Sequence, residues 1–217
     1  MADLQVPEQQ TYQGQFGEFT ITEDDRRGVI IYRAGLMVAA LSFAIGTALI
    51  LWQPNNPLLL SLLTPLYTCF CAALAVSLWT IHIYLVPLHR ALQILWVVGA
   101  IASLGVAHFN PEPFALTVYQ QPLTLLGVGF TFAALTGVFF KEAFCFDRPE
   151  TKLLTPLIPV LLLGHLTGIL SPTLEQILLA VWAALFVLFA LRKTFQDIPA
   201  DIGDKSVVRQ TDVGLVE

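Results

Sequence analysis

Charged residues are scarce in this sequence, and long stretches contain none. Charged side chains make up 12% of the 217 residues, whereas soluble domains contain roughly 25%. The deficit is uneven, because it is concentrated in uninterrupted apolar runs while both ends of the chain are polar. This distribution argues against an ordinary soluble domain and favours a chain that lies within a lipid bilayer.

Several familiar motifs are also missing, and each absence narrows the range of functions. The sequence contains no HExxH zinc motif, no nucleophile elbow and no glycine-rich phosphate loop. The cysteines give no disulfide framework, since Cys69 and Cys71 lie within an apolar run and Cys145 lies on the inner side, where thiols stay reduced. The net charge of −5 and the lack of a basic stripe argue against nucleic acid as a partner.

Six apolar runs are long enough to cross a bilayer as helices. A helix needs about 20 apolar residues for this, with a lower limit near 17. The runs lack the polar face of a soluble helix and the period-two alternation of barrel strands. The predicted spans are Gly35–Trp52, Leu58–Ile81, Ala91–Ala107, Leu123–Phe140, Leu153–Leu170 and Leu174–Leu191. The predicted fold class is therefore all-α, a polytopic six-transmembrane-helix bundle.

The positive charges predict how these spans are oriented. With six spans the loops alternate between sides, and all 11 Lys and Arg residues fall on the side that holds both termini. Because cationic residues are retained in the cytoplasm, we predict that both termini are cytoplasmic, or stromal if the chain lies in a plastid. The polar start MADLQVPEQQ does not resemble a cleavable signal, so the first span is expected to be an uncleaved signal-anchor.

The polar segments predict three regions: a polar N-terminal segment over 1–22, a membrane domain over 23–196 and a disordered polar tail over 197–217. Thr22 precedes three carboxylates, which resembles a capping box and predicts that the first helix begins near Glu23. Ser171 before Pro172 predicts the start of the last helix. The loop His108–Gln121 is expected to lie along the membrane interface.

Small residues at four-residue spacing predict where helices approach closely. Gly129, Ala133 and Gly137 form such a ridge on the fourth span, and Gly99 and Ser103 form another on the third. We expect both ridges to be buried against neighbouring helices.

The candidate site lies at the inner membrane surface, where polar residues gather among phenylalanines. One interpretation is lysines that extend to water beside a solvated turn; the other is a surface that recognises a protein partner or a lipid headgroup. A metal held by both histidines with Glu142 or Cys145 is less expected, because Pro87 should break the helix between them. The candidate residues are His82, His89, Arg90, Lys141, Glu142 and Arg148.

His165 is the one basic or acidic residue deep within an apolar run, and such residues are functional candidates because they are costly to bury. It either forms a hydrogen bond to a neighbouring helix or binds the metal of a haem or pigment. The sequence predicts no other cofactor.

Four stretches resemble an uncharacterised integral membrane protein family of cyanobacteria and plastids, one defined only as a domain of unknown function. They are Gly17–Leu36, His82–Gln93, Phe130–Phe146 and Leu161–Gly168, and the likeness extends from about residue 12 to about residue 196. The resemblance implies a photosynthetic source and a plasma or thylakoid membrane. It implies no activity, cofactor or catalytic residue.

Three functions follow as hypotheses. The first is a non-enzymatic assembly or scaffold factor of a photosynthetic membrane, with the lipid bilayer and other membrane proteins as partners. The second is a small-molecule transporter or channel, because the string LLTPL recurs at Leu62–Leu66 and Leu153–Leu157 in spans of opposite direction, as in an inverted repeat. The third is a membrane enzyme or a haem- or pigment-binding protein that uses the histidines.

Overall fold

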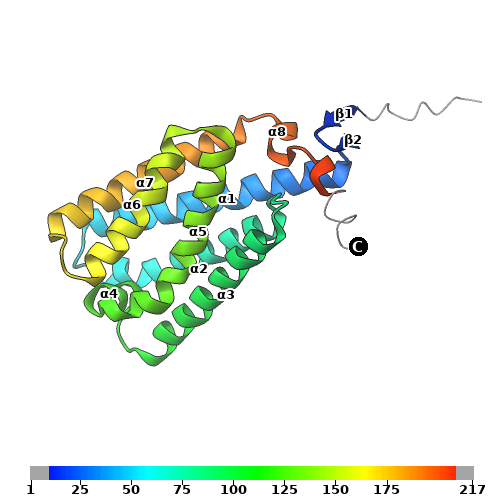
Figure 1. The fold of residues 1–217 in the computed structure, drawn as a ribbon. Helices are drawn as coiled ribbons and strands as arrows, with labels where there is room; N and C mark the ends of the chain where they lie inside the picture. The colour runs from blue at the N-terminus through cyan, green and yellow to red at the C-terminus, as the bar shows by residue number, and fades with distance from the viewer. Residues whose placement is uncertain (1–9, 209–217) are drawn as a thin grey trace, which may run out of the picture.

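The computed structural model describes residues 10–208, which form a small β-hairpin followed by a bundle of helices. Figure 1 shows β1, β2 and α8 at one end of the bundle, here called the terminal end, and α4 with the α6–α7 turn at the other, here called the α4 end. The elements are β1 (Thr11–Gly14), β2 (Gly17–Thr20), α1 (Glu23–Trp52), α2 (Pro57–Thr80), α3 (Val86–Phe109), α4 (Phe114–Gln120), the 3-10 turn η1 (Pro122–Thr124), α5 (Leu125–Phe146), α6 (Pro149–Leu166), α7 (Pro172–Thr194) and α8 (Ile198–Ile202).

Among residues 10–208, five helical segments are long and apolar enough to cross a membrane: α1, α2, α3, η1 with α5, and α7. The chain is therefore a polytopic helical membrane protein, as the sequence predicted. The predicted fifth span, Leu153–Leu170, corresponds to α6, which is not among these five. It has only 18 residues and begins with Glu150 and Lys152, and it ends at Leu166, shortly before Gly168 adopts a φ of +67°.

The helix starts follow from capping chemistry, as predicted. The Thr22 hydroxyl accepts a hydrogen bond from the Asp25 N–H at 3.2 Å, and the Asp25 carboxylate accepts one from the Thr22 N–H at 2.7 Å. Asp25 thus replaces the usual glutamate of the capping box. The Ser171 hydroxyl accepts from the Leu174 N–H at 3.4 Å, and α7 begins at Pro172.

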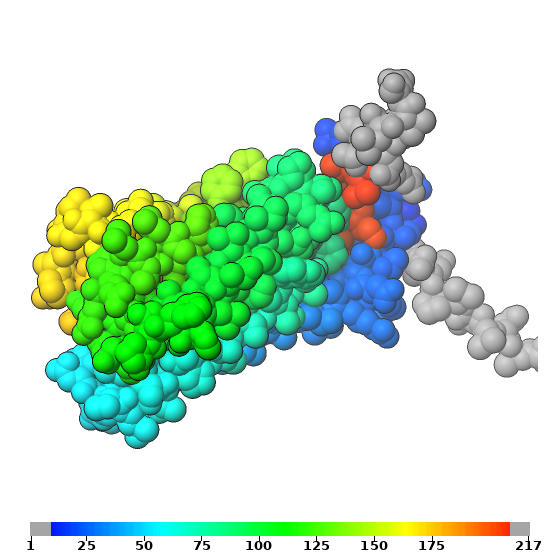
Figure 2. All heavy atoms as spheres, turned by 90° about the horizontal axis from the view of Figure 1, so that it is seen from below, coloured from blue at the N-terminus to red at the C-terminus, as the bar shows by residue number. Residues whose placement is uncertain are grey.

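The bundle is held by two groups of contacts: α1 packs against α2 and α7, and α5 packs against α3 and α6. The largest core side chains are Tyr32, Phe70, Phe139, Trp182, Phe186 and Phe189. Figure 2 shows the face that α3 covers, with both described chain ends gathered beyond it at the terminal end. On α3, Ile94, Ile101 and Leu104 are more than 60% exposed. This apolar outer surface suits lipid chains.

Helices α3 and α5 come close together at some of the predicted small residues but not at others. A Cβ on Gly99 would collide with the main chain and side chain of Thr131, and one on Gly137 would collide with Leu92. Gly129 faces open space, and Ala133 is exposed. The prediction of a buried α5 ridge was therefore wrong for Gly129 and Ala133, while that of an α3 ridge at Gly99 and Ser103 is confirmed, because Ser103 is also buried.

The chain ends are more ordered than the sequence suggested. Residues 11–20 form the hairpin, in which the Tyr12 and Phe19 rings stack at 5.6 Å. Residues 198–202 form α8, and Asp204 accepts a hydrogen bond from the Gln15 N–H at 2.7 Å, which holds the pKa of Asp204 below its ordinary value. The expected disorder after Gln196 therefore does not extend over residues 197–208, and residues 209–217 lie outside the described part.

The loop His108–Gln121 contains a short helix, α4, that the sequence did not predict. Phe114 and Thr117 of α4 are buried. The Phe114 ring lies 4.6 Å from that of Tyr67 on α2, so α4 packs onto the end of the bundle. Tyr119, at 53% exposure, does face outward.

Replacing Gly99 by leucine is expected to destabilise the protein, because the new side chain collides with the α5 main chain at Thr131. Overpacking of this kind costs about 1–3 kcal/mol or more. The matched substitution Gly129→Leu, on the open face of α5, is expected to change stability little. Thermal unfolding of both variants in detergent measures the difference, and equal midpoints would refute this account of α3–α5 packing.

Candidate functional site

At the terminal end, an ion network is buried between four helices. The Lys193 ammonium group on α7 lies 2.5 Å from Glu142 Oε2 on α5 and also contacts the Asp201 carboxylate on α8. Lys193 and Glu142 have 0% exposure, and Asp201 has 5%. Isolated ions at such depth cost several kcal/mol each, so they persist only when paired and hydrogen bonded.

Helix α1 completes this Lys193 network. The Tyr32 hydroxyl donates to Glu142 Oε1 at 3.1 Å, and Lys141 Nζ lies 2.9 Å from the same oxygen. Arg33 Nε donates to Asp201 Oδ2 at 2.7 Å. Every carboxylate of the network therefore has at least two partners, and the network joins α1, α5, α7 and α8.

A second charged group lies beside the Lys193 network. Glu150 is 2% exposed, and its Oε2 accepts from Arg192 Nη1 at 2.7 Å. Arg148 Nη2 donates to Gln196 Oε1 at 2.5 Å. Arg148 Nη1 and Glu150 Oε1 face each other at 3.8 Å and have no hydrogen-bond partner among the described residues.

The structure brings together three of the six residues predicted at the inner surface: Lys141, Glu142 and Arg148. Their charges are directed inward, however, since the Lys141 and Arg148 side chains are only 11% and 12% exposed and Glu142 is fully buried. The residues were predicted to meet a partner or ligand; in the described chain they chiefly contact one another and neighbouring helices.

The other three do not join this group. His82 lies 3.7 Å from Asp25, and burial lowers its pKa although the Asp25 carboxylate opposes this. His89 Nε2 lies 2.7 Å from the Leu78 carbonyl oxygen, and Arg90 donates to Gln93 at the helix surface. The chain is not helical over residues 82–85, so the two histidines do not share a helix, and His89 lies in the first turn of α3. Within residues 10–208, no three His, Cys, Asp or Glu side chains are placed to hold a metal ion.

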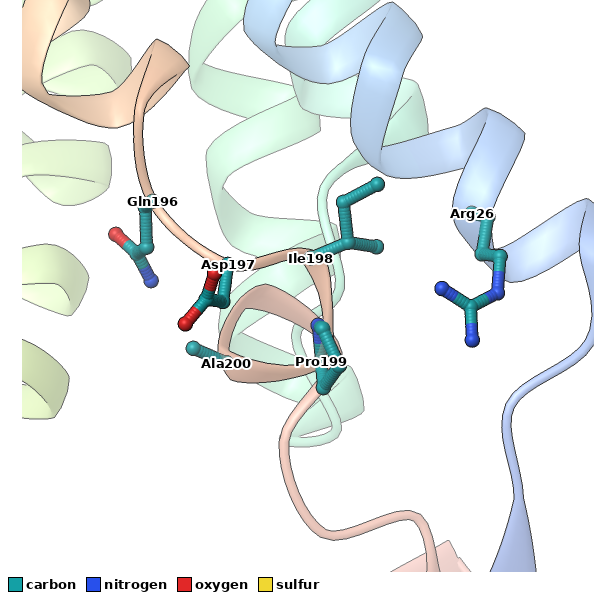
Figure 3. Close-up of a pocket in the computed structure, with 6 residues that line it drawn as sticks. All are labelled: Arg26, Gln196, Asp197, Ile198, Pro199 and Ala200. Carbon is teal, nitrogen blue, oxygen red and sulfur yellow. The ribbon is translucent and has the colours of Figure 1, made fainter. Parts of the chain in front are cut away.

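An open hollow lies beside α8 at this end. Figure 3 shows Arg26 of α1 on one side of it, and Gln196, Asp197, Ile198, Pro199 and Ala200 on the other. Its walls are short and widely open. It therefore resembles a surface depression more than a binding site.

The α4 end contains a deeper cavity of about 550 Å³. Helices α1, α2, α5, α6 and α7 form its walls, and α4 contributes residues 114–116 and 118–120. Its lining is mostly apolar and rich in aromatic side chains, which are Phe43, Tyr67, Phe70, Phe114, Tyr119, Phe132 and Trp182. Its polar lining side chains include Asn55, Gln120, His165, Glu175 and Gln176.

His165 on α6 contacts both α7 and α4 at this cavity. Its Nδ1 lies 2.8 Å from Glu175 Oε1 on α7, and its Nε2 lies 3.1 Å from the Tyr119 carbonyl oxygen on α4. A carbonyl oxygen only accepts hydrogen bonds, so His165 Nε2 must carry a hydrogen. The contact between Nδ1 and Glu175 then needs another hydrogen, either on Nδ1 or on the Glu175 carboxyl group. Burial and the Glu175 carboxylate raise the pKa of Tyr119.

This arrangement bears on the predicted cofactor. Both His165 nitrogens already contact oxygen atoms. The metal of a haem or pigment would have to displace one of these two contacts. The hydrogen bond to a neighbouring helix, the other interpretation of His165, is present.

Sequence reasoning missed Lys193, Asp201, Glu175 and Trp182 as site residues. Lys193 was counted as a positive charge retained inside, and Asp201 fell in the segment expected to be disordered. One signal was available for Glu175: it and His165 flank the short α6–α7 turn, so both were bound to lie at the same level.

Comparison with known proteins supports the conclusion that this chain is a membrane protein. A profile of the family described as "Uncharacterized integral membrane protein (DUF2301)" matches residues 76–209. An uncharacterized protein of Haemophilus influenzae is 27% identical over 179 residues, which cover 82% of this chain and 88% of the relative. No solved structure gave a significant match. The resemblance to an uncharacterised integral membrane family is confirmed, but a relative in Haemophilus means that the likeness is not specifically cyanobacterial.

Replacing Lys193 by methionine is expected to destabilise the protein strongly, because Glu142 and Asp201 would each lose a buried counter-charge. Breaking a buried pair typically costs about 3–5 kcal/mol. The control Lys152→Met removes an ion pair whose Asp147 side chain is 88% exposed, and such surface pairs are worth at most about 1 kcal/mol. Chemical unfolding in detergent compares the two. Similar small losses would show that the Lys193 network does not hold the terminal end together.

Proposed function

The chain belongs to this family of integral membrane proteins, and on that premise we propose that it is a non-enzymatic binding protein that takes a small, mostly apolar molecule into the α4-end cavity. The cavity itself carries this proposal. Its volume of about 550 Å³ lies within the range of about 300–1,000 Å³ typical of small-molecule sites, which are apolar concavities with a few polar groups.

The contrast between the two ends supports the choice of this site. At the terminal end the charged side chains meet one another, so little directional chemistry is left for a guest. At the α4 end a space of about 550 Å³ is left between the helices. If the protein took up the bound molecule on one side of the membrane and released it on the other, it would be a transporter that uses the same cavity.

We further propose that α6 is a sixth span and that both termini are cytoplasmic. Helix α6 runs from the terminal end, where Glu150 meets Arg192, to the α4 end, where His165 meets Glu175. It therefore runs beside α7 over most of the length of α7. The ten described Lys and Arg residues lie in the elements that meet at the terminal end, which favours that end as the cytoplasmic one.

A scaffold or assembly function in a photosynthetic membrane is a second proposal, and other membrane proteins would be its partners. It rests on the resemblance and on exposed groups at the terminal end, where Phe144 is 84% exposed and Arg90 projects from the start of α3. The largely buried side chains of Lys141, Glu142 and Arg148 would not contact a partner directly; they would hold the helices that form this surface in place.

The topology can be tested with reporter fusions. Fusions at Asn55 and Glu112 are expected to read as translocated, whereas fusions at Arg148 and at the C-terminus should read as cytoplasmic. With α6 outside the membrane the number of spans becomes odd, and the C-terminal reporter would be translocated. That result would refute the six-span arrangement without affecting the cavity.

Binding can be tested by filling the cavity. Gly46 of α1 lines it, and a Cβ there would make ordinary contacts with Leu63 and Leu66 at 3.5 and 3.9 Å, so Gly46→Leu should fold. Native mass spectrometry of the protein purified from membranes should show a retained small molecule in the wild type. We expect occupancy in Gly46→Leu to fall about tenfold or more, which corresponds to at least about 1.4 kcal/mol.

Gly129→Leu is the matched control, because it adds the same side chain to α5 in open space outside the cavity. It should retain as much of the molecule as the wild type, and thermal midpoints should show that both variants are folded. Equal occupancy in all three proteins would mean that any bound molecule is ordinary lipid on the outer surface.

A further inference from the structure

We propose that the guest of the α4-end cavity is a neutral, flat ring compound that carries carbonyl-type hydrogen-bond acceptors, of the quinone class. This inference rests on the proposed function and adds the chemistry of the guest. It follows from hydrogen-bond donors in the cavity wall that have no partner, from the rings around them, and from the charges that the wall holds.

Three hydrogen-bond donors of buried residues in the cavity lining have no hydrogen-bond partner among the described residues. The indole N–H of Trp182 on α7 is one, and this residue is only 1% exposed. The hydroxyls of Ser42 and Thr47 on α1 are the others, and these two residues are 7% and 6% exposed. Buried tryptophan N–H groups usually find an acceptor, and leaving one unpaired costs free energy.

The two α1 hydroxyls differ from others in the same bundle. Serine and threonine in a helix often donate to the carbonyl four residues earlier, as Ser103 does to Gly99 at 2.7 Å and Thr136 does to Phe132 at 2.8 Å. Ser42 and Thr47 do not. Because these three donors belong to residues of two helices that line one cavity, a guest with more than one acceptor and no need for a donor satisfies them best.

The surrounding rings favour a flat guest. The Phe43 ring lies 4.4 Å from that of Trp182, and the Phe132 ring meets Trp182 edge to face at 5.3 Å. Aromatic rings pack well against other rings in offset and edge-to-face geometry. The guest therefore lies among rings while its acceptors reach the donors on α1 and α7.

The charges favour a neutral guest. Apart from tyrosine hydroxyls, the titratable side chains in the lining are His165 and Glu175, and these two contact each other. Neither is left to pair with an ion on the guest, and an unpaired charge in an apolar cavity is strongly disfavoured. A quinone meets all three conditions, since it is neutral and flat and its carbonyl oxygens accept without donating.

The test compares two probes of nearly the same shape, duroquinone and durene, which differ by the two carbonyl oxygens. Equilibrium dialysis against purified protein in detergent measures both affinities. Trp182→Phe and Thr47→Val should each weaken duroquinone binding about 2- to 10-fold, the effect of one neutral hydrogen bond, and change durene binding less than twofold. Trp96→Phe is the control, because Trp96 donates to the Cys71 carbonyl outside the cavity lining.

The outcomes separate this inference from the proposed function. If Gly46→Leu blocks both probes while Trp182→Phe and Thr47→Val affect both probes equally or neither, the cavity binds apolar molecules but the quinone class is refuted. If neither probe binds, or if Gly46→Leu leaves binding of both unchanged, the binding function falls and this inference falls with it. Thr47→Val decides the matter if Trp182→Phe does not fold.

Discussion

The ammonium group of Lys193, enclosed by the carboxylates of Glu142 and Asp201, organises the terminal end of this protein. All three are buried, so each charge is tolerable only while the others are in place. The four helices that supply the network are therefore held in one relative arrangement. Near the α4 end the bundle carries few charges, and the cavity with its unpartnered donors lies there.

Local signals were sufficient for the parts of the fold that depend on a few adjacent residues. Thr22 with Asp25 marked the start of α1, and Ser171 with Pro172 marked that of α7. The break before α3 agrees with Pro87, because the missing N–H and fixed φ of proline are tolerated in the first turn of a helix but not in its interior. Long uncharged runs identified the membrane helices, except that α6, which carries Glu150 and Lys152 in its first turn, is less apolar than the spanning stretches of the other five.

The contacts between helices were much harder to read, because lipid chains and helix interfaces are equally apolar. Gly99 and Gly129 look alike in the sequence, yet one touches the main chain of α5 and the other faces open space. Nor does any local pattern join Glu142 to Lys193, 51 positions away. Three of the six predicted inner-surface residues do lie together, but the inward direction of their side chains depends on such distant pairs. The cavity likewise depends on the space left between six helices that are spread along the sequence.

Biosynthesis of this chain must proceed for some time without the contacts that close its terminal end. Arg33 emerges early, while its partner Asp201 follows 168 positions later. At about 5–20 residues per second, translation of that interval takes roughly 10–30 s. Throughout it, the guanidinium group must be accommodated by water or lipid phosphates at the membrane surface. The nascent bundle is therefore an open intermediate until the last residues leave the ribosome, and it is during this interval that the quality-control proteases of the membrane can reach it.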